Sequence, residues 1–337
     1  MKAVGYKKSL PIADPQSLLD VEISTPAATG RDLLVEIKAV SVNPVDTKVR
    51  MRAEPDKEEY KILGFDAAGI VKQVGPEASL FKAGDEVYYA GSIARQGTNS
   101  EFHLVDERIV GKKPKSLNFA HAAALPLTTI TAWELLFDRF GVKPGKPANA
   151  GHLLIIGGAG GVGSILIQLA RRLTGLTVIA TASRPETQRW CVELGAHFVI
   201  DHSQPLAAQL QAIGIKEVEI IASVAATSAH YPKLVEALAP QGQFGLIDDP
   251  KTLDALPLKR KAASLHWEFM FARPVFGTPD MIAQHLLLDE VADLVDAGVI
   301  RSTFSESLGA INAANLKTAH ALVESGKARG KVVLEGF

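Results

Sequence analysis

One short segment near the middle of the chain constrains its fold more than any other. A glycine-rich run separates the apolar stretch 153–156 from a helix-like stretch, 164–173, and it comprises Gly157, Gly158, Ala159, Gly160, Gly161, Val162 and Gly163. The glycines at 158, 160 and 163 satisfy G-x-G-x-x-G, which combines a tight turn, room for a pyrophosphate against the backbone, and close helix-on-strand packing. The following helix would direct its unpaired N–H groups at the phosphates. The run therefore predicts the strand-to-helix turn of a dinucleotide-binding unit.

The segments downstream alternate between strand-like and helix-like patterns. Short apolar runs lie at 177–182, 197–200, 218–224 and 243–247, and helical stretches between them lie at 186–194, 206–213 and 231–239. Such alternation implies crossover connections and a parallel sheet. A P-loop is excluded because Ser164 follows Gly163 and no Lys-Ser/Thr pair is present. We therefore predict an α/β fold with a doubly wound parallel sheet over this region.

The end of the second expected strand indicates which dinucleotide is bound. Units that bind NAD normally carry an acidic residue there, about 20 residues after the glycines, which holds the ribose 2′-hydroxyl. Here the stretch 180–184 contains no carboxylate and ends in Ser183 and Arg184. Because a hydroxyl beside a guanidinium can donate hydrogen bonds to a 2′-phosphate, we predict NADP(H) as the cofactor, with Arg189 as a weaker third contact. Alternatively, Arg184 is a solvated charge at a helix start.

Length and composition bound the class of protein. A chain of 337 residues exceeds the usual span of one core, so two domains are expected, and a hydrophobic content of 47% permits both. The formal charge of −1 argues against an electrostatic nucleic-acid binder. No secretory signal is evident, and no stretch approaches the ~20 apolar residues needed to span a bilayer. We expect a cytoplasmic protein with a small-molecule substrate and no nucleic-acid or membrane partner.

Cysteine and histidine usage argues against a metal centre. The single cysteine, Cys191, cannot form an internal disulfide or a multi-thiolate zinc site, and the nine histidines show no metal-binding spacing. Cys191 lies in a helical pattern and is interpreted as a small buried residue in preference to a nucleophile. His103, in a strand-like segment, is likewise interpreted as structural.

The first 120 residues differ in pattern from the middle of the chain. Short strand-like runs bounded by turn residues lie at 33–43, 66–75, 84–91 and 100–110. These runs are typical of a small β-rich barrel or sandwich. Later segments comprise helical material at 119–140, amphipathic helices at 279–298 and 313–326, and a closing strand within 330–337. The chain is therefore expected to return to its first domain at the end.

The order of these features resembles one family throughout the chain. The resemblance is carried by A-x-S-x-N-P-x-D from Ala39 to Asp46, G-x-D-A-A-G from Gly64 to Gly69, LPLTTITAWELL, GGAGGVG and the terminal GKVVLEGF. Together these motifs look like the medium-chain dehydrogenase/reductase superfamily, within it the zinc-lacking quinone oxidoreductase branch, and more narrowly the zinc-type alcohol dehydrogenase-like group. The resemblance implies a GroES-like catalytic domain over 1–125 and 273–337, and a Rossmann NADP(H)-binding domain over 126–272.

Departures from the zinc-dependent relatives bear on the chemistry. Asn43 stands where those enzymes carry a ligating cysteine, and Phe65 stands where they carry the histidine of a G-H-E motif. The loop with four structural-zinc cysteines is also missing from the sequence. An amide and a phenyl ring cannot replace thiolate and imidazole around a zinc ion, so we predict that no metal is bound.

Without zinc, the feasible reaction is hydride transfer from nicotinamide C4 to an acceptor that is already electrophilic. Quinones fit because their conjugation spreads the incoming charge, and α,β-unsaturated aldehydes or ketones are the alternative. Asn43 is the first candidate donor to the developing oxyanion, or else it braces the Asn43-Pro44 turn. Lys48 would orient substrate, donate a proton or contact the cofactor, or else be a surface lysine. Asp66 is a plausible anchor behind the site and a doubtful general base.

Further contacts follow from the resemblance alone. Thr131 matches the threonine that borders the nicotinamide half of the cofactor, and Thr128 is a weaker candidate. Backbone contacts to the nicotinamide amide fall at Phe244–Ile247 and Phe269–Met270, with Ile247, Phe269 and Met270 the specific candidates, while Lys331 would approach cofactor or substrate. A planar acceptor would suit an aromatic pocket of Tyr60, Phe65, Trp267, Phe269 and Phe271, although such residues also build cores.

Two other classes of protein share part of this pattern. A short-chain reductase is disfavoured because its glycine motif lies near the amino terminus and no Tyr-x-x-x-Lys pair appears here. A non-catalytic NADP(H)-binding sensor would retain the cofactor site without turnover. In the resembled family the nucleotide-domain sheet extends across a dimer, and the apolar stretch 263–272 suits that strand. We expect a homodimer.

Overall fold

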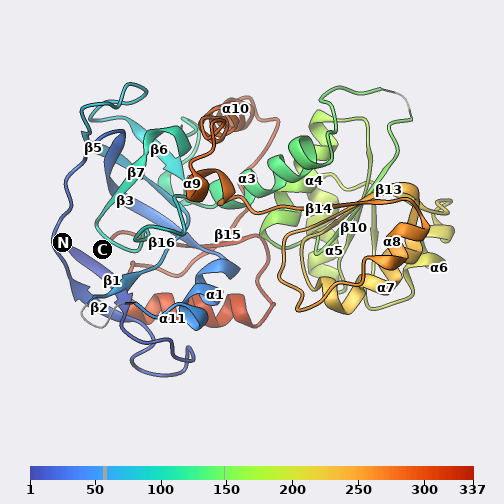
Figure 1. The fold of residues 1–337 in the computed structure, drawn as a ribbon, viewed down its shortest axis with the longest axis horizontal. Helices are drawn as coiled ribbons and strands as arrows, with labels where there is room; N and C mark the ends of the chain where they lie inside the picture. The colour runs from blue at the N-terminus through green and yellow to red at the C-terminus, as the bar shows by residue number, and fades with distance from the viewer. Residues whose placement is uncertain (56–58, 148) are drawn as a thin grey trace. The chain divides into compact units, whose positions relative to one another are not determined.

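Two compact units make up the part of the chain that the structure describes, residues 1–55, 59–147 and 149–337. In this computed structural model the first unit contains Met1–Ile130 and Phe271–Phe337, and the second contains Thr131–Met270. The boundaries expected from the sequence, 125/126 and 272/273, lie close to these. Figure 1 shows both termini on the first unit, so the chain leaves this unit and returns to it.

Two β-sheets dominate the first unit. In the larger sheet the strands follow the order β15-β16-β3-β5-β6-β8, and β7 pairs with β3. Its strands are β3 (Asp32–Val42), β5 (Ala67–Val74), β6 (Glu86–Tyr89), β7 (Phe102–Asp106), β8 (Val110–Lys112), β15 (Phe304–Ser307) and β16 (Lys331–Glu335). The smaller sheet has the order β2-β1-β4, with β1 (Lys2–Tyr6), β2 (Leu19–Glu22) and β4 (Lys61–Ile62). The β-rich pattern of the first domain is therefore confirmed, and β16 places the end of the chain beside β3.

Helices of the first unit pack around these sheets. They are α1 (Pro44–Arg52), η1 (Glu107–Ile109), α2 (Phe119–Ala123), α3 (Pro126–Trp133, which crosses into the second unit), α9 (Ala272–Phe276), α10 (Ala283–Asp296) and α11 (Ala313–Glu324). Helices α1 and α11 lie side by side (Figure 1). The buried Arg50 joins them, because its guanidinium contacts His320 Nδ1 at 3.1 Å and Glu324 Oε1 at 2.5 Å.

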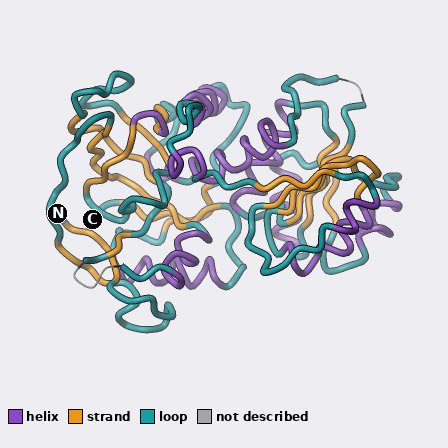
Figure 2. Tube along the Cα trace, viewed as in Figure 1, coloured by secondary structure: helices purple, strands orange, loops and turns teal. Residues whose placement is uncertain are grey.

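The second unit is a parallel sheet with helices on either side of the strands in the view of Figure 2. Its strand order, β11-β10-β9-β12-β13-β14, is that of the Rossmann fold. The strands are β9 (His152–Ile156), β10 (Thr177–Thr181), β11 (Phe198–Ile200), β12 (Val218–Ser223), β13 (Leu238–Leu246) and β14 (Ser264–Trp267). The helices are η2 (Glu134–Arg139, a π-helix), α4 (Gly161–Leu173), α5 (Pro185–Leu194), α6 (Leu206–Ala212), α7 (Thr227–Ala237) and α8 (Leu256–Arg260). The predicted α/β fold with a doubly wound sheet is confirmed.

Several local expectations differ from the structure. Helix α1 and the short strands β1, β2, β4 and β15 were not among the expected elements. The stretch 263–272 is a strand only over Ser264–Trp267, because the chain then leaves the sheet and enters α9 at Ala272.

Cys191 is fully buried on α5, and His103 is buried with its ring nitrogens bonded to Gln96 and Tyr89, as expected for structural residues.

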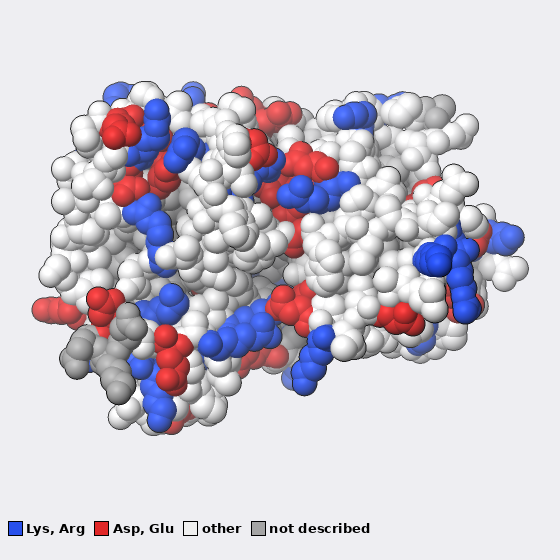
Figure 3. Space-filling model, viewed as in Figure 1, with Lys and Arg blue, Asp and Glu red and all other residues white. Residues whose placement is uncertain are grey.

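Charges of both signs occur on the surface, and the helices are of moderate length. On the face seen in Figure 3, Lys and Arg side chains are interspersed with Asp and Glu. Within the described ranges, no helix has both the length and the apolarity needed to cross a bilayer.

Candidate catalytic cluster and cofactor site

Helix α1 begins directly after Asn43, which is its N-cap residue in an extended conformation. Pro44 occupies the first helical position, where a missing N–H is harmless. Asp46, in the first turn, accepts the Asn43 N–H at 2.7 Å and the Gly64 N–H at 3.0 Å. The Asp46 carboxylate braces this turn together with the N-cap residue Asn43, in the arrangement of a capping box.

The Asn43 side chain also enters a buried cluster in the first unit. Its Nδ2 donates to Asp66 Oδ2 at 2.7 Å, and its Oδ1 accepts from Lys331 Nζ at 2.5 Å. Asn43, Asp66 and Lys331 are 0%, 0% and 3% exposed. The amide is committed to internal partners, and this geometry argues against Asn43 as the donor to a substrate oxyanion.

Asp66 is the centre of this cluster. Its Oδ2 lies 3.1 Å from Lys331 Nζ and accepts from Ser41 Oγ at 2.9 Å, while its Oδ1 accepts the Leu127 N–H at 2.7 Å. Lys331 also donates to the Val42 carbonyl oxygen at 2.9 Å. Asp66, Asn43 and Val42 together use the three ammonium hydrogens, so Lys331 serves as an internal counter-ion in this structure.

Burial dominates the electrostatics of the cluster. It raises the pKa of Asp66, and the Lys331 ammonium and three hydrogen bonds oppose that rise. Burial also raises the pKa of Asp46 to about 7, against the hydrogen bond from the Asn43 N–H and the charge of Lys331. The pKa of Lys331 is lowered by burial and supported by Asp66. Two buried carboxyl groups thus share one buried cation.

These residues do not fit a zinc ion. At the two positions where the resemblance implies zinc ligands the chain has Asn43 and Phe65, whose amide and phenyl groups are poor replacements for thiolate and imidazole. The Lys331 ammonium, 3.1 Å from the Asp66 carboxylate, would also repel a divalent cation beside it. Across the residues that the structure describes, no group of three or more His, Cys, Asp or Glu side chains has the arrangement of a metal site.

In the second unit, the glycine-rich turn joins β9 to α4. Gly157 has φ +82°, so the left-handed residue of the turn lies one position before Gly158, which we had expected to make it. A Cβ at Gly163 would lie 2.2 Å from the Gly157 carbonyl oxygen, so only glycine fits. A Cβ at Gly160, the N-cap of α4, would meet only that same oxygen at 3.4 Å. There is therefore room beside the backbone at Gly160, whereas Gly163 is packed tightly against the preceding turn. This arrangement fits a pyrophosphate at the start of α4.

The other predicted residues of the turn lie where such a ligand would contact backbone. Ala159 is buried, and Gly161 and Val162 form the half-buried first turn of α4. The end of β10 holds the turn in place, because Thr181 Oγ1 accepts the Gly157 N–H and the Thr181 carbonyl accepts the Gly158 N–H, both at 3.1 Å. The strand that precedes the predicted 2′-phosphate contacts is thus fixed to the glycine-rich turn.

Ser183 and Arg184 follow β10 directly. Ser183 is exposed, and Arg184 is the N-cap residue of α5, with Pro185 in the first helical turn. Arg184 Nε lies 3.2 Å from Glu186 Oε1, and both side chains are about half exposed, at 40% and 49%. Such a surface ion pair contributes little, so it does not prevent Arg184 from binding a phosphate. Arg189 lies exposed further along α5.

The residues expected around the nicotinamide lie on three segments of the chain. Thr131 is buried on α3, and Thr128 Oγ1, on the same helix, donates at 3.1 Å to the carbonyl oxygen of Leu125, the residue just before that helix. Ile247 follows β13 at the carboxyl edge of the sheet, the edge that also carries the glycine-rich turn. Phe269 is 50% exposed and Met270 is buried, just beyond β14.

The expected aromatic pocket is only partly assembled within the first unit. Phe65 and Phe271 are both buried and meet edge to face, with ring centroids 5.4 Å apart. Tyr60 is half-buried, and Lys7 Nζ lies over its ring at 4.8 Å. Trp267 and Phe269 are half-exposed residues of the second unit. Lys48 lies half-buried on α1, two residues after Asp46.

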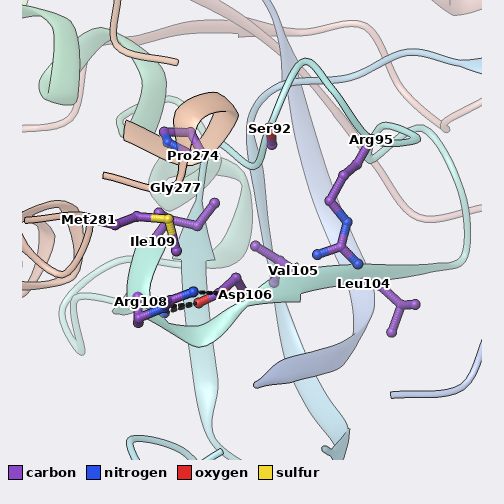
Figure 4. A pocket seen from close by; sticks show the side chains of 10 residues that line it. All are labelled: Ser92, Arg95, Leu104, Val105, Asp106, Arg108, Ile109, Pro274, Gly277 and Met281. Atoms are coloured by element: carbon purple, nitrogen blue, oxygen red, sulfur yellow. Dashed lines mark hydrogen bonds and ion pairs between the residues drawn. The ribbon is translucent and has the colours of Figure 1, made fainter. Parts of the chain in front are cut away.

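A cavity of about 150 Å³ in the first unit shares no residue with the Asn43–Asp66–Lys331 cluster. Figure 4 shows Arg95, Arg108, Met281 and Pro274 around it, with Arg108 paired to Asp106. None of the residues that the sequence predicted for the site lines this cavity. It therefore gives no support to a substrate site at this position.

Sequence reasoning missed several members of the buried groups. Ser41, Asp46 and the Leu127 N–H complete the cluster around Asp66, and two glutamates, Glu134 and Glu268, are buried in the second unit. A signal was available for Asp46, because N-P-x-D combines an N-cap residue, a proline at the first position and an acidic third position. Contacts between distant segments, such as Asp66 with Leu127, carry no such local signal.

Two sequence families match the chain. The alcohol dehydrogenase GroES-like domain matches residues 29–115, and the zinc-binding dehydrogenase family matches residues 194–334. A zinc-type alcohol dehydrogenase-like protein of Staphylococcus aureus (strain MSSA476) is 40% identical over 338 residues, which cover 99% of each chain. The mitochondrial NAD(P)H oxidoreductase RTN4IP1 of Homo sapiens is 30% identical, over 90% of this chain and 81% of its own length.

Other relatives match in part or in structure. The 2-methylene-furan-3-one reductase of Solanum lycopersicum is 37% identical over 196 residues, 55% of this chain and 48% of that protein. A crystal structure from Rhizobium etli CFN 42, described as a candidate zinc-dependent alcohol dehydrogenase, is 61% identical with a TM-score of 0.96, covering 100% and 98% of the two chains. The Escherichia coli quinone oxidoreductase complexed with NADPH shares the fold, with a TM-score of 0.82 at 24% identity over 99% and 100% of the chains.

Proposed function

The chain belongs to the medium-chain dehydrogenase/reductase superfamily of oxidoreductases, and from this premise we propose that it transfers hydride from NADPH to a quinone without a metal ion. The observation that carries the proposal is the composition of the buried cluster. Asn43 and Phe65 occupy the family's zinc-ligand positions, and the Lys331 ammonium lies 3.1 Å from Asp66 in the same cluster. An enzyme built this way needs an acceptor that is activated by its own conjugation.

The cofactor half of the proposal depends on the second unit. Backbone N–H groups at the start of α4 would hold the pyrophosphate where Gly160 leaves the turn open. Ser183 and Arg184 would donate to the 2′-phosphate, which an acidic residue at this position would repel. The E. coli quinone oxidoreductase, described with NADPH, has the same fold and supports this choice.

The acceptor half depends on Lys48, Thr131 and the buried cluster. When bound, NADPH supplies a hydride from nicotinamide C4. Thr131 would border the nicotinamide, and Lys48 would donate a hydrogen bond or a proton to the acceptor oxygen, because the amide of Asn43 is engaged by Asp66 and Lys331. Asn43, Asp66 and Lys331 then act as positioning residues that fix the start of α1, on which Lys48 lies.

A carbon–carbon double bond next to a carbonyl is the alternative acceptor. This second proposal is favoured by one observation, the 37% identity to a 2-methylene-furan-3-one reductase over 55% of this chain. The same cofactor position would deliver hydride to the β-carbon of an enal or enone, and a donor such as Lys48 would then stabilise the enolate oxygen.

We also propose a cytoplasmic homodimer with a small-molecule substrate and no nucleic-acid or membrane partner. Strand β14 is an edge strand, and Trp267 on it is 52% exposed. A half-exposed tryptophan beside unpaired backbone groups is what a second copy would cover.

The decisive experiment measures turnover and metal content on the same preparation. NADPH oxidation is followed at the nicotinamide absorbance band with a panel of quinones and a panel of enals and enones, before and after treatment with a chelator. Quinone reduction that survives chelation, with zinc well below one ion per chain, supports the main proposal. Turnover confined to the enals and enones favours the alternative, tight NADPH binding without turnover favours a sensor, and stoichiometric zinc that is needed for turnover refutes both reductase proposals.

A further inference from the structure

Two glutamates of the second unit are buried together at the end of edge strand β14. Glu134 is the first residue of the π-helix η2, and Glu268 follows the last residue of β14. Their side chains are 1% and 0% exposed. The Glu268 N–H donates to the Leu246 carbonyl oxygen at 3.0 Å, which continues the pairing of β14 with β13. Both carboxyl groups are therefore fixed beside the segment 268–270.

A single arginine, Arg139, forms ion pairs with both carboxyl groups. Arg139, the last residue of η2, donates from Nε to Glu268 Oε2 at 2.8 Å, and its Nη2 lies 4.0 Å from Glu134 Oε2. The other ionisable side chains on η2 and β14 are Asp138, which is exposed, and His266. The His266 ring packs edge to face on Phe140, and burial together with the charge of Arg139 lowers its pKa. His266 therefore supplies no second positive charge near neutral pH.

The charge of this group balances only when the two glutamates hold one proton. Two carboxylates in hydrogen-bonding contact inside a protein cannot both ionise without a large penalty. Burial, followed by the charge of Glu134 and its hydrogen bond, raises the pKa of Glu268 to about 9, and Arg139 opposes this rise. At neutral pH the group consists of one carboxylic acid, one carboxylate and one guanidinium.

We propose that this shared proton joins η2 to the end of β14 and thereby positions Phe269 and Met270 for the nicotinamide of the cofactor. Glu134, Glu268 and Arg139 are then positioning residues of the cofactor site. The inference rests on the proposed function, and on the nicotinamide contacts that the family resemblance implies at residues 269 and 270. Loss of the proton leaves two carboxylates facing each other, and their repulsion separates η2 from the strand. A π-helical turn at this point is consistent with a functional role, because such turns are frequent at functional sites.

The test compares NADPH affinity against pH in the whole protein and in three variants. If only the protonated pair is competent, the apparent Kd of the wild-type protein rises about tenfold between about pH 7 and about pH 10, one pH unit above the pKa. E268Q retains a neutral hydrogen-bonding group and should lose this rise, and E134Q provides the same test if E268Q does not fold. E236Q, which changes an exposed glutamate of α7, should keep the wild-type profile. Coincident profiles for wild type and both buried variants overturn the inference.

A second measurement separates this inference from the proposed function. Because the pKa of Glu268 is raised in the folded state from 4.5 to about 9, its stabilising contribution is complete below about pH 4.5 and is lost as pH rises through about 9. The melting temperature of cofactor-free E268Q, relative to that of wild type, should therefore increase as pH rises from about 6 to about 9. Above about pH 9 the difference between the two should stay constant. A growing gap without a change in NADPH affinity overturns the positioning role. No NADPH binding at any pH overturns the proposed function and the positioning role together, whereas binding with a flat profile overturns only the latter.

Discussion

Replacing Lys331 with methionine removes the only cation that the described cluster around Asp66 contains, and it tests whether this cluster holds the first unit together. Lys331 Nζ contacts Asp66 Oδ2 at 3.1 Å, Asn43 Oδ1 at 2.5 Å and the Val42 carbonyl at 2.9 Å. Breaking a buried ion pair from one side costs about 3–5 kcal/mol, because the remaining charge stays buried. For a unit of this size, about 2–4 °C are lost per kcal/mol, so K331M should melt about 6–20 °C below wild type.

A matched control and a double variant make this prediction specific. K82M also removes a lysine that contacts an aspartate, Asp85 at 2.8 Å, but Lys82 is 83% exposed, and the change should cost less than about 1 kcal/mol. The double variant D66N/K331M leaves no lone charge at this pair, so it should be less destabilised than the sum of D66N and K331M.

The stability of K331M relative to wild type should also change with pH in one defined direction. Burial raises the folded-state pKa of Asp66 above its ordinary value of 3.8, and Lys331 opposes that rise. Removing Lys331 raises the pKa of Asp66 further, so the variant should lose stability relative to wild type as pH increases above about 4. Additive effects in the double variant, together with a pH-independent gap, would show that Lys331 acts only through its packing.

Four further outcomes are expected. G160A should weaken NADPH binding more than tenfold by fluorescence titration while leaving the melting temperature nearly unchanged, whereas G163A should lower both, because its Cβ would lie 2.2 Å from the Gly157 carbonyl oxygen. R184A should lower the preference for NADPH over NADH by about 10–100-fold in steady-state kinetics, and an unchanged ratio would remove Arg184 from the 2′-phosphate site. D46N should remove the part of the stability loss that Asp46 contributes between about pH 4 and about pH 7, its pKa, so the melting temperature of cofactor-free D46N should fall less steeply over that range than that of wild type. W267K should convert a dimer into a monomer in sedimentation velocity, and a wild-type monomer at micromolar concentration would refute the proposed assembly.

The features that could be predicted from the sequence are those encoded locally. The turn around Gly160, the alternation of strands and helices in the second unit, and the buried position of Cys191 on α5 all follow from patterns within about twenty residues. Even there the assignment was imperfect, because the left-handed residue is Gly157, and nothing in the pattern of consecutive glycines distinguishes it from Gly158.

The features that could not be predicted depend on contacts between distant segments. The roles expected of Asn43 and Lys331 did not include the buried cluster that these residues form, because each partner lies on another strand or turn, 23 and 288 residues away for Asn43. The same is true of Glu134 and Glu268, each of which is an ordinary charged residue in its own segment. Whether a carboxylate is solvated or buried is decided by the tertiary packing, and no periodicity records it.

The two buried groups share one electrostatic arrangement, with one cation for two carboxyl groups. In the first unit Lys331 faces Asp66 and acts on Asp46, and in the second unit Arg139 faces Glu268 and Glu134. In each group one carboxyl group is not balanced by the cation and has a raised pKa, about 7 for Asp46 and about 9 for Glu268. Both contributions therefore weaken as pH rises, so the protein should be most stable in mildly acidic solution, and its stability should fall across neutral pH with a component from each unit. That direction is opposite to the one set by carboxylates whose pKa is lowered by ion pairs, and it follows from burial exceeding the attraction of a single shared cation.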